Sequence, residues 1–179
     1  STPIKSSAAS DVYKRQSVAC GAPFKDDFPV LGIEKVTKSF LDDLKREGKT
    51  LRHMMLFKRT NNRAALGVAP VVLPLESLEA QVRSNFNCVT LEGDLVGRLS
   101  FYGQGAGGQP TADAVLQDLT SIRTRRVEPL PVAAPPVYDA GLLRGAGLTA
   151  HGILPDRTLE ELARAARETG EFMTFQPEP

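Results

Sequence analysis

The chain has 179 residues, of which 41% are hydrophobic and 24% are charged, and its formal net charge is +1. This length suits one domain with an adequate core, and the balanced charge gives no reason to expect a nucleic acid or an anionic membrane as partner. No apolar run approaches the roughly 20 residues that cross a bilayer, and the N-terminus lacks the apolar core of a secretory signal. Cys20 and Cys88 are too few for a disulfide framework or a zinc site, so we expect a cytoplasmic protein with free thiols and no metal.

The first 16 residues predict no structure. Asp11–Gln16, D-V-Y-K-R-Q, resembles the translated end of a transposon used to prepare DNA for sequencing, and an ordinary polar tail is the alternative. We therefore expect residues 1–16 to be a non-native or disordered leader. On the adapter interpretation the natural protein extends upstream and this chain is a fragment.

A short helix is predicted after Thr37, which is a good N-cap. An apolar stripe and a final glycine support it, together with a charge order that suits the helix dipole. The stripe is Phe40, Leu41 and Leu44, the acidic residues expected early are Asp42 and Asp43, the basic residues expected late are Lys45 and Arg46, and the stop is Gly48. Because adjacent residues on a helix do not face one site, a solvated face is preferred to a catalytic pair for the two aspartates.

Two extended runs follow, over residues 50–59 and 63–75, with Asn61 and Asn62 as the turn between them. The first alternates in the manner of a strand. Pro70 and Pro74 favour a sheet edge for the second. His53, in the first run, has no identifiable catalytic partner and is interpreted as a packed or surface histidine.

The next stretch predicts a short helix over residues 75–82, capped at Ser77, and then a hairpin. Its strands are residues 85–92 and 95–102, joined by the two-residue turn Gly93–Asp94. Cys88 is interpreted as a small core residue rather than a nucleophile.

A glycine-rich turn then connects the second hairpin strand to a helix. Four glycines fall within six residues, Pro110 suits the first helical turn, and an apolar stripe follows. The glycines are Gly103, Gly105, Gly107 and Gly108, and the stripe is Val115, Leu116, Leu119 and Ile122. Such a backbone lets an anionic or flat group come close, although glycines that merely make a tight turn are a second interpretation.

Two nucleotide-binding motifs are rejected for this turn. Gly103, Gly105 and Gly108 fit G-x-G-x-x-G, but the preceding strand alternates where a dinucleotide fingerprint needs a buried apolar strand. Prolines follow the candidate ribose acid, Glu128, and spoil a central second strand. A Walker-type phosphate loop fails because no Gly-Lys-Ser/Thr occurs.

The segment F-Y-G-Q-G-A-G-G-Q-P-T-A-D-A-V-L-Q-D-L resembles the end of the catalytic domain of homoserine dehydrogenases, which carry G-x-G-A-G-x-x-P-T-A-x-x-V-x-x-D-L. Weaker similarity in N-C-V-T-L-E-G-D-L-V-G, V-A-P-V-V-L-P and G-I-E-K-V-T extends it over about residues 28–122. Asn87 matches an asparagine that the family often carries, and a turn asparagine is the alternative.

The resemblance implies an α/β (α+β) fold, a mixed β-sheet backed by helices, representing part of the substrate domain of such an enzyme. It implies reduction of L-aspartate 4-semialdehyde to L-homoserine with NADP or NAD as cofactor, and a homodimer in the full-length parent. Gly105, Gly107, Pro110 and Thr111 would line the nicotinamide side of the cleft. Glycines let the backbone approach a flat ring, and the protein supplies the positioning that hydride transfer needs.

Two family features are missing. No Rossmann glycine fingerprint precedes Ser17, and no lysine stands in the family's D-P-x-x-D-(apolar)-x-G-x-D-x-x-x-K context, because Lys25 in P-F-K-D-D does not fit. We therefore assign no catalytic residue and expect the chain alone to be inactive.

The tail resembles no family pattern. Arg123, Arg125 and Arg126 are interpreted as a basic helix end. A proline-rich, irregular segment over residues 127–136 leads to a helix with a Thr158/Glu161 capping box, an apolar stripe and a stop at Gly170. The stripe is Leu159, Leu162, Ala163 and Ala166.

The expected organisation is a leader (1–16), a partial catalytic domain (17–126) and a proline-rich linker with a C-terminal helix (127–179). A truncated homoserine dehydrogenase is the leading function. Two alternatives stay open: a non-catalytic ligand-binding or dimerisation module, and another NAD(P)-dependent oxidoreductase that shares this substrate domain.

Overall fold

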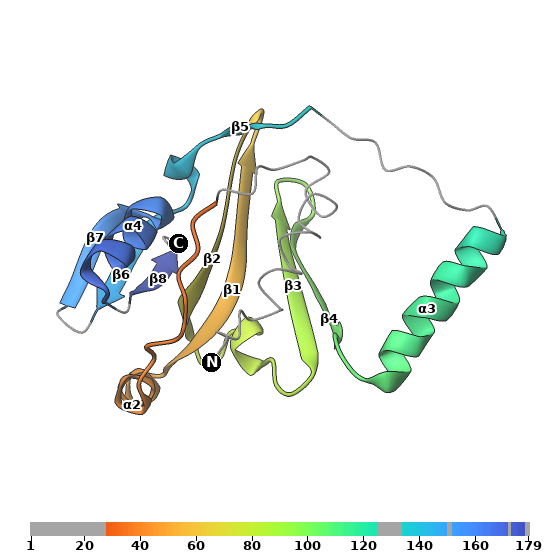
Figure 1. Ribbon diagram of the computed structural model, residues 1–179, viewed down its shortest axis with the longest axis horizontal. Helices are drawn as coiled ribbons and strands as arrows, with labels where there is room; N and C mark the ends of the chain where they lie inside the picture. Colours follow the sequence, from red (N-terminus) through yellow and green to blue (C-terminus); the bar gives the residue numbers. More distant parts are fainter. Residues whose placement is uncertain (1–27, 125–133, 150–151, 172, 178–179) are drawn as a thin grey trace. The chain divides into compact units, whose positions relative to one another are not determined.

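The computed structural model describes residues 28–124, 134–149, 152–171 and 173–177 (Figure 1). They divide into two compact units, unit 1 from Ser1–Pro74 and Leu130–Pro179, and unit 2 from Leu75–Pro129. The leader, Cys20, Lys25, Arg125, Arg126 and Glu128 lie outside the described residues. No helix in the described part of the chain is long and apolar enough to cross a membrane.

The described residues of unit 1 form a six-stranded mixed sheet and two α-helices. Its elements are α2 (Lys38–Arg46), β1 (Lys49–Thr60), β2 (Arg63–Pro74), β5 (Val137–Tyr138), the 3₁₀ turn η2 (Ala140–Leu142), β6 (Arg144–Thr149), β7 (Gly152–Thr158), α4 (Leu159–Thr169) and β8 (Thr174–Pro177). The strand order is β1-β2-β8-β6-β7, with β5 also on β2. Strand β2 is parallel to β5 and β8, and the other pairs are antiparallel. The expected mixed sheet backed by helices is confirmed.

Strand β2 carries the core of unit 1. Its residues from Ala64 to Val72 are all buried, as the nearly continuous apolar run A-A-L-G-V-A-P-V-V requires. Gly67 lets helix α4 come close, because a Cβ there would collide with the side chain of Leu159. Around this contact lie further buried residues, namely Leu31, Ala65, Ala69, Val71, Leu143, Leu162, Ala163, Met173 and Phe175.

The prediction that β2 lies at a sheet edge is wrong. Strand β1 pairs along one side of β2, and shorter partners share the other side. There Val68 bridges Val30, and Val71 pairs with Phe175. Pro70 lies between Val68 and Val71, at the point where the partner of β2 changes from the segment around Val30 to strand β8. A proline that donates no hydrogen bond is therefore tolerated inside the sheet.

Both predicted helices of unit 1 are confirmed. Capping residues next to each helix in the sequence determine where it begins and ends. Thr37 caps α2, and Gly48 follows it with a φ of +71°. Asp42 and Asp43 lie beyond the first turn of α2, so the expectation that they sit early in the helix is wrong. Helix α4 has the full Thr158/Glu161 capping box and ends at Gly170 with a φ of +69°.

Unit 2 contains the 3₁₀ turn η1 (Glu79–Gln81), the hairpin strands β3 (Phe86–Gly93) and β4 (Gly97–Gln104), and helix α3 (Gly108–Arg123). The helix predicted over residues 75–82 is only η1, whose N-cap position is Leu78 rather than Ser77. The hairpin turn has three residues rather than two, since Gly93 pairs with Gly97. Gly97, with a φ of +64°, supplies the left-handed conformation that such a turn needs.

The apolar side chains of unit 2 are largely exposed. One face of the hairpin carries Val89, Leu91, Leu99 and Phe101, each 43–59% exposed. The predicted stripe on α3 exists, but Val115, Leu116, Leu119 and Ile122 are 53–64% exposed. Among residues 75–124, only Glu79 and Ala80 are buried.

Candidate functional site

The glycine-rich bend joins β4 to α3 and opens the helix without a side-chain cap. Gly107 is the N-cap, and its φ of +126° is a conformation that residues with a Cβ rarely adopt. The first helical hydrogen bond runs from the Thr111 amide to the Gly107 carbonyl, at 3.1 Å. Pro110 has no amide hydrogen, so the Gly107, Gly108 and Gln109 amides are the ones outside the helix's own hydrogen-bond pattern.

The bend is exposed and borders a shallow, open hollow. Its lining is Gly107, Gly108, Thr111, Ala112, Val115 and Leu116, and none of these residues is charged. A Cβ at Gly108 would meet nothing within 4 Å, so the helix start is clear of other side chains. An apolar floor with backbone amides at one end suits a flat ring that carries a carboxamide. It does not suit a pyrophosphate, which needs cationic partners or several converging amides.

Asn85, just before β3, and Asn87, within β3, hold the bend from the other strand of the hairpin. The Gly105 amide donates to the Asn85 carbonyl at 2.7 Å, and the Asn85 side-chain amide donates to the Ala106 carbonyl at 2.6 Å. Asn87 packs so tightly on Gly105 that a Cβ there would collide with it. Asn87 lies within β3, so the interpretation of it as a turn residue is wrong.

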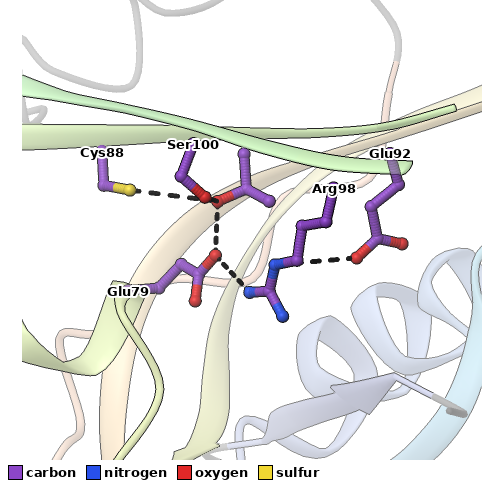
Figure 2. Close-up of polar contacts among 6 residues, drawn as sticks. Glu79, Cys88, Glu92, Arg98 and Ser100 are labelled. Atoms are coloured by element: carbon purple, nitrogen blue, oxygen red, sulfur yellow. Dashed lines mark hydrogen bonds and ion pairs between the residues drawn. The ribbon is translucent and has the colours of Figure 1, made fainter. Parts of the chain in front are cut away.

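The other face of the hairpin carries a polar network centred on Glu79 of η1 (Figure 2). The Glu79 carboxylate, 10% exposed, accepts a hydrogen bond from Thr90 and one from Arg98 at 2.7 Å. Because Thr90 gives its one hydrogen to Glu79, Ser100 donates to Thr90 across 3.1 Å. Figure 2 also shows Glu92 beside Arg98, with 4.0 Å between charged atoms.

The network shifts the acidity of Glu79. Burial by itself raises the pKa of this carboxyl, but the hydrogen bonds from Thr90 and Arg98 outweigh it and hold the pKa below its usual value. The same contact with Glu79 raises the pKa of Arg98. Glu79 is therefore ionised near neutral pH and ties η1 to the hairpin as a structural link.

The structure brings Gly105, Gly107, Pro110 and Thr111 together, on one bend and the helical turn that follows it. The other candidates lie elsewhere. His53 is on β1 in unit 1, with Nε2 3.3 Å from the Leu31 carbonyl.

Cys88 is half-buried in the hairpin, with Sγ 3.9 Å from the Thr90 hydroxyl. Asp43 forms an exposed ion pair with Arg46 at 2.6 Å, which supports a solvated face for α2. Asn85 and Glu79 were missed by the sequence analysis, because their partners lie 11 to 21 residues away.

Comparison with known proteins gives one consistent result. The family model for homoserine dehydrogenase matches residues 16–120. The chain is 35% identical over 107 residues to a homoserine dehydrogenase of Pseudomonas aeruginosa, covering 59% of this chain and 25% of that protein. It is 38% identical over 107 residues to a homoserine dehydrogenase of Mycobacterium tuberculosis, covering 57% and 24% respectively.

Solved structures agree with these sequence matches. A homoserine dehydrogenase from Thiobacillus denitrificans superposes with a TM-score of 0.64 and 28% identity, covering 78% of this chain and 36% of that one. An S. aureus homoserine dehydrogenase at pH 7.5 superposes with a TM-score of 0.59 and 26% identity, covering 69% and 31%. The chain spans about a quarter of the length of the curated relatives it matches.

Proposed function

The chain belongs to the homoserine dehydrogenase family, and from that premise we propose that it serves the NAD(P)H-dependent reduction of L-aspartate 4-semialdehyde to L-homoserine. This step leads toward threonine, methionine and isoleucine. When bound, the nicotinamide supplies a hydride to the aldehyde carbon, and a proton added to the oxygen completes the alcohol. The contribution of this chain is to position the reacting groups, which is what a cofactor enzyme asks of its protein.

The observation that carries the proposal is the uncovered helix start beside an apolar hollow. Gly105 leaves room for the Asn87 side chain, Gly107 takes the positive φ at which α3 begins, and Pro110 sets the first turn of α3. Thr111 follows in the lining of the hollow. We assign these four residues to the nicotinamide side of the cleft, with the Gly108 and Gln109 amides oriented toward a carbonyl oxygen.

We assign the other parts of the active site, namely the groups that bind the nucleotide half of the cofactor and the catalytic lysine, to regions other than residues 28–124. The nucleotide half of NADP or NAD and the catalytic lysine have no counterpart in the matched residues. The match spans about a quarter of its relatives, which leaves room for both in the remaining length. We further propose a cytoplasmic enzyme that acts on a small molecule, without nucleic-acid or membrane partners, and that is a homodimer when complete.

Gly108→Leu tests the assignment of the loop. Leucine is a good helix former, and the site has free space, so the helix should fold normally while the new side chain fills the hollow. Titration of the ¹⁵N-labelled 179-residue chain with NADP⁺ should shift the Gly107, Gly108 and Thr111 amide signals in the wild type. In the variant we expect affinity to fall by at least about tenfold, equivalent to ~1.4 kcal/mol.

Gly103→Leu is the matched control, because a Cβ at Gly103 also meets nothing within 4 Å, yet Gly103 does not line the hollow. It should bind NADP⁺ like the wild type. Absence of any wild-type response at these amides, or equal binding by Gly108→Leu, would contradict the assignment.

A further inference from the structure

Asn85 forms hydrogen bonds to the glycine-rich bend through both its main chain and its side chain. Its carbonyl accepts the Gly105 amide at 2.7 Å, and its side-chain amide donates to the Ala106 carbonyl at 2.6 Å. Phe86 pairs with Gln104 in the hairpin, so Asn85 lies directly beyond the last strand pair. The main-chain bond to Gly105 therefore extends the ladder of the hairpin by one step. The side-chain bond then fixes the orientation of the Ala106–Gly107 peptide.

Fixing the Ala106 carbonyl also fixes the amide on the other side of the same bond. A trans peptide is planar, so its carbonyl oxygen and the next N–H point in opposite directions. The bond from Asn85 therefore turns the Gly107 N–H away from the Asn85 side chain. Gly107 is also the N-cap of α3, so the direction in which the helix begins depends on this one peptide plane.

The bend has little else to hold it. Gly105 and Gly107 have no side chains to pack, and no side chain caps the helix. Glycine loses more backbone freedom on ordering than any other residue, so an unsupported bend of this composition samples many conformations. Asn87 restricts Gly105 by packing alone, whereas Asn85 makes directional hydrogen bonds.

We propose that Asn85 is a positioning residue, which holds the bend in the conformation that presents the start of α3 to the nicotinamide. This inference rests on the proposed function of the bend. Asn85 touches no reacting group and acts through the orientation of the Ala106–Gly107 peptide.

The test compares Asn85→Asp with the wild type in the full 179-residue chain at pH 7. Aspartate keeps the shape of asparagine but is ionised and cannot donate to the Ala106 carbonyl. Two NMR readouts are used: the ¹⁵N heteronuclear NOE of Gly107 and Gly108 without ligand, and the shifts of the same amides on titration with NADP⁺. We expect a lower NOE and about tenfold weaker binding, while the β3 and β4 signals stay in place.

Asn62→Asp is the matched control, because it makes the same substitution at an exposed turn in unit 1 and should change neither readout. Asn85→Ala, which removes the donor without adding a charge, should reproduce both effects. If both Asn85 variants keep the wild-type NOE and affinity, the positioning role is wrong while the function of the bend stands. If the wild type itself does not respond to NADP⁺, the proposed function of the bend is wrong, and this inference is overturned with it.

Discussion

At the scale of single residues, the Glu79 carboxylate links the 3₁₀ turn η1 to both strands of the hairpin. It accepts a hydrogen bond from Thr90 of β3 and another from Arg98 of β4. The Glu79 side chain is only 10% exposed, so these contacts are largely shielded from solvent.

The Glu79 link predicts a pH-dependent stability for unit 2. Because the folded pKa of Glu79 is below its usual value of 4.5, its contribution is complete above that value and is lost as the pH falls through the folded pKa. Glu79→Gln should cost about 1 kcal/mol at pH 7, and the difference from the wild type should shrink at acid pH. A urea titration followed by the NMR signals of β3 and β4, at pH 7 and at pH 3.5, measures both.

Glu92→Gln is the appropriate control, since the exposed Glu92 carboxylate is 4.0 Å from Arg98 and should contribute little. A Glu79→Gln effect that is equally large at both pH values would be inconsistent with the ionised link.

The candidate site could be predicted where its residues lie close together in the sequence. The glycines of the bend and Pro110 fall within eight residues, so their pattern could be recognised directly. Glu79 could not be recognised, because its partners Thr90 and Arg98 lie 11 and 19 residues away, on the two hairpin strands. Nothing around Glu79 in the sequence distinguishes a buried carboxylate from an ordinary exposed glutamate.

At the scale of elements, helices were predicted better than strands. Caps are encoded within four residues, so α2 and α4 begin and end as expected. Strands β6 and β7 were missed, because R-G-A-G-L-T and G-I-L-P-D-R-T contain the glycines and proline that usually mark loops. In β6 the glycines serve close packing. A Cβ at Gly147 would lie 2.5 Å from Leu162 of α4, and one at Gly145 would collide with the Gln176 carbonyl of β8.

Gly145→Ala should therefore destabilise unit 1. The neighbour that must yield is backbone rather than a flexible side chain, so β6 and β8 must separate locally. We expect a loss of about 1–3 kcal/mol, measured by thermal unfolding with circular dichroism. Gly103→Ala, at a strand position with open space, should change stability by no more than about 0.5 kcal/mol. Equal melting of the two variants would disprove the packing argument.

At the scale of the whole molecule, the described chain contains two units of different character. Unit 1 has a buried core, whereas unit 2 exposes apolar residues on both its hairpin and its helix. In unit 1, strands β6 to β8 share one sheet with β1 and β2, and local sequence patterns carry no information about such a distant pairing. The resemblance identified the family correctly from residues 28–122, and the tail, which follows no family pattern, had to be placed by the structure.

The purified chain is expected to show no NADPH oxidation with aspartate semialdehyde. We propose that residues 105–111 form one wall of the nicotinamide site, and that regions outside the matched residues 16–120 supply the nucleotide half of the site and the catalytic lysine. A spectrophotometric assay at 340 nm tests this, with a full-length relative as positive control. Activity that persists through further purification would refute the proposal that other regions supply the nucleotide half of the site and the catalytic lysine.

Exposed apolar side chains on α3 should make the isolated chain self-associate. Leu116 and Leu119 are 62% and 58% exposed on one face of the helix. The double variant Leu116→Lys/Leu119→Lys should bind less 1-anilinonaphthalene-8-sulfonate and stay monomeric at higher concentration, as measured by light scattering. Gln117→Lys adds a charge on the same helix without removing apolar surface and should behave more like the wild type. Identical association of all three proteins would exclude this face as the cause.

The place of β8 between β2 and β6 governs the order in which unit 1 can assemble. Val71 of β2 pairs with Phe175 of β8, and the ribosome adds Phe175 long after β2 has been synthesised. This pairing therefore cannot form early. Until then, among the described residues, β2 has β1, β5 and the segment around Val30 beside it, and its edge at Val71 stays unpaired. Pairings so distant in sequence form slowly. A nascent chain that stops before β8 is therefore expected to bind chaperones and to be susceptible to proteolysis.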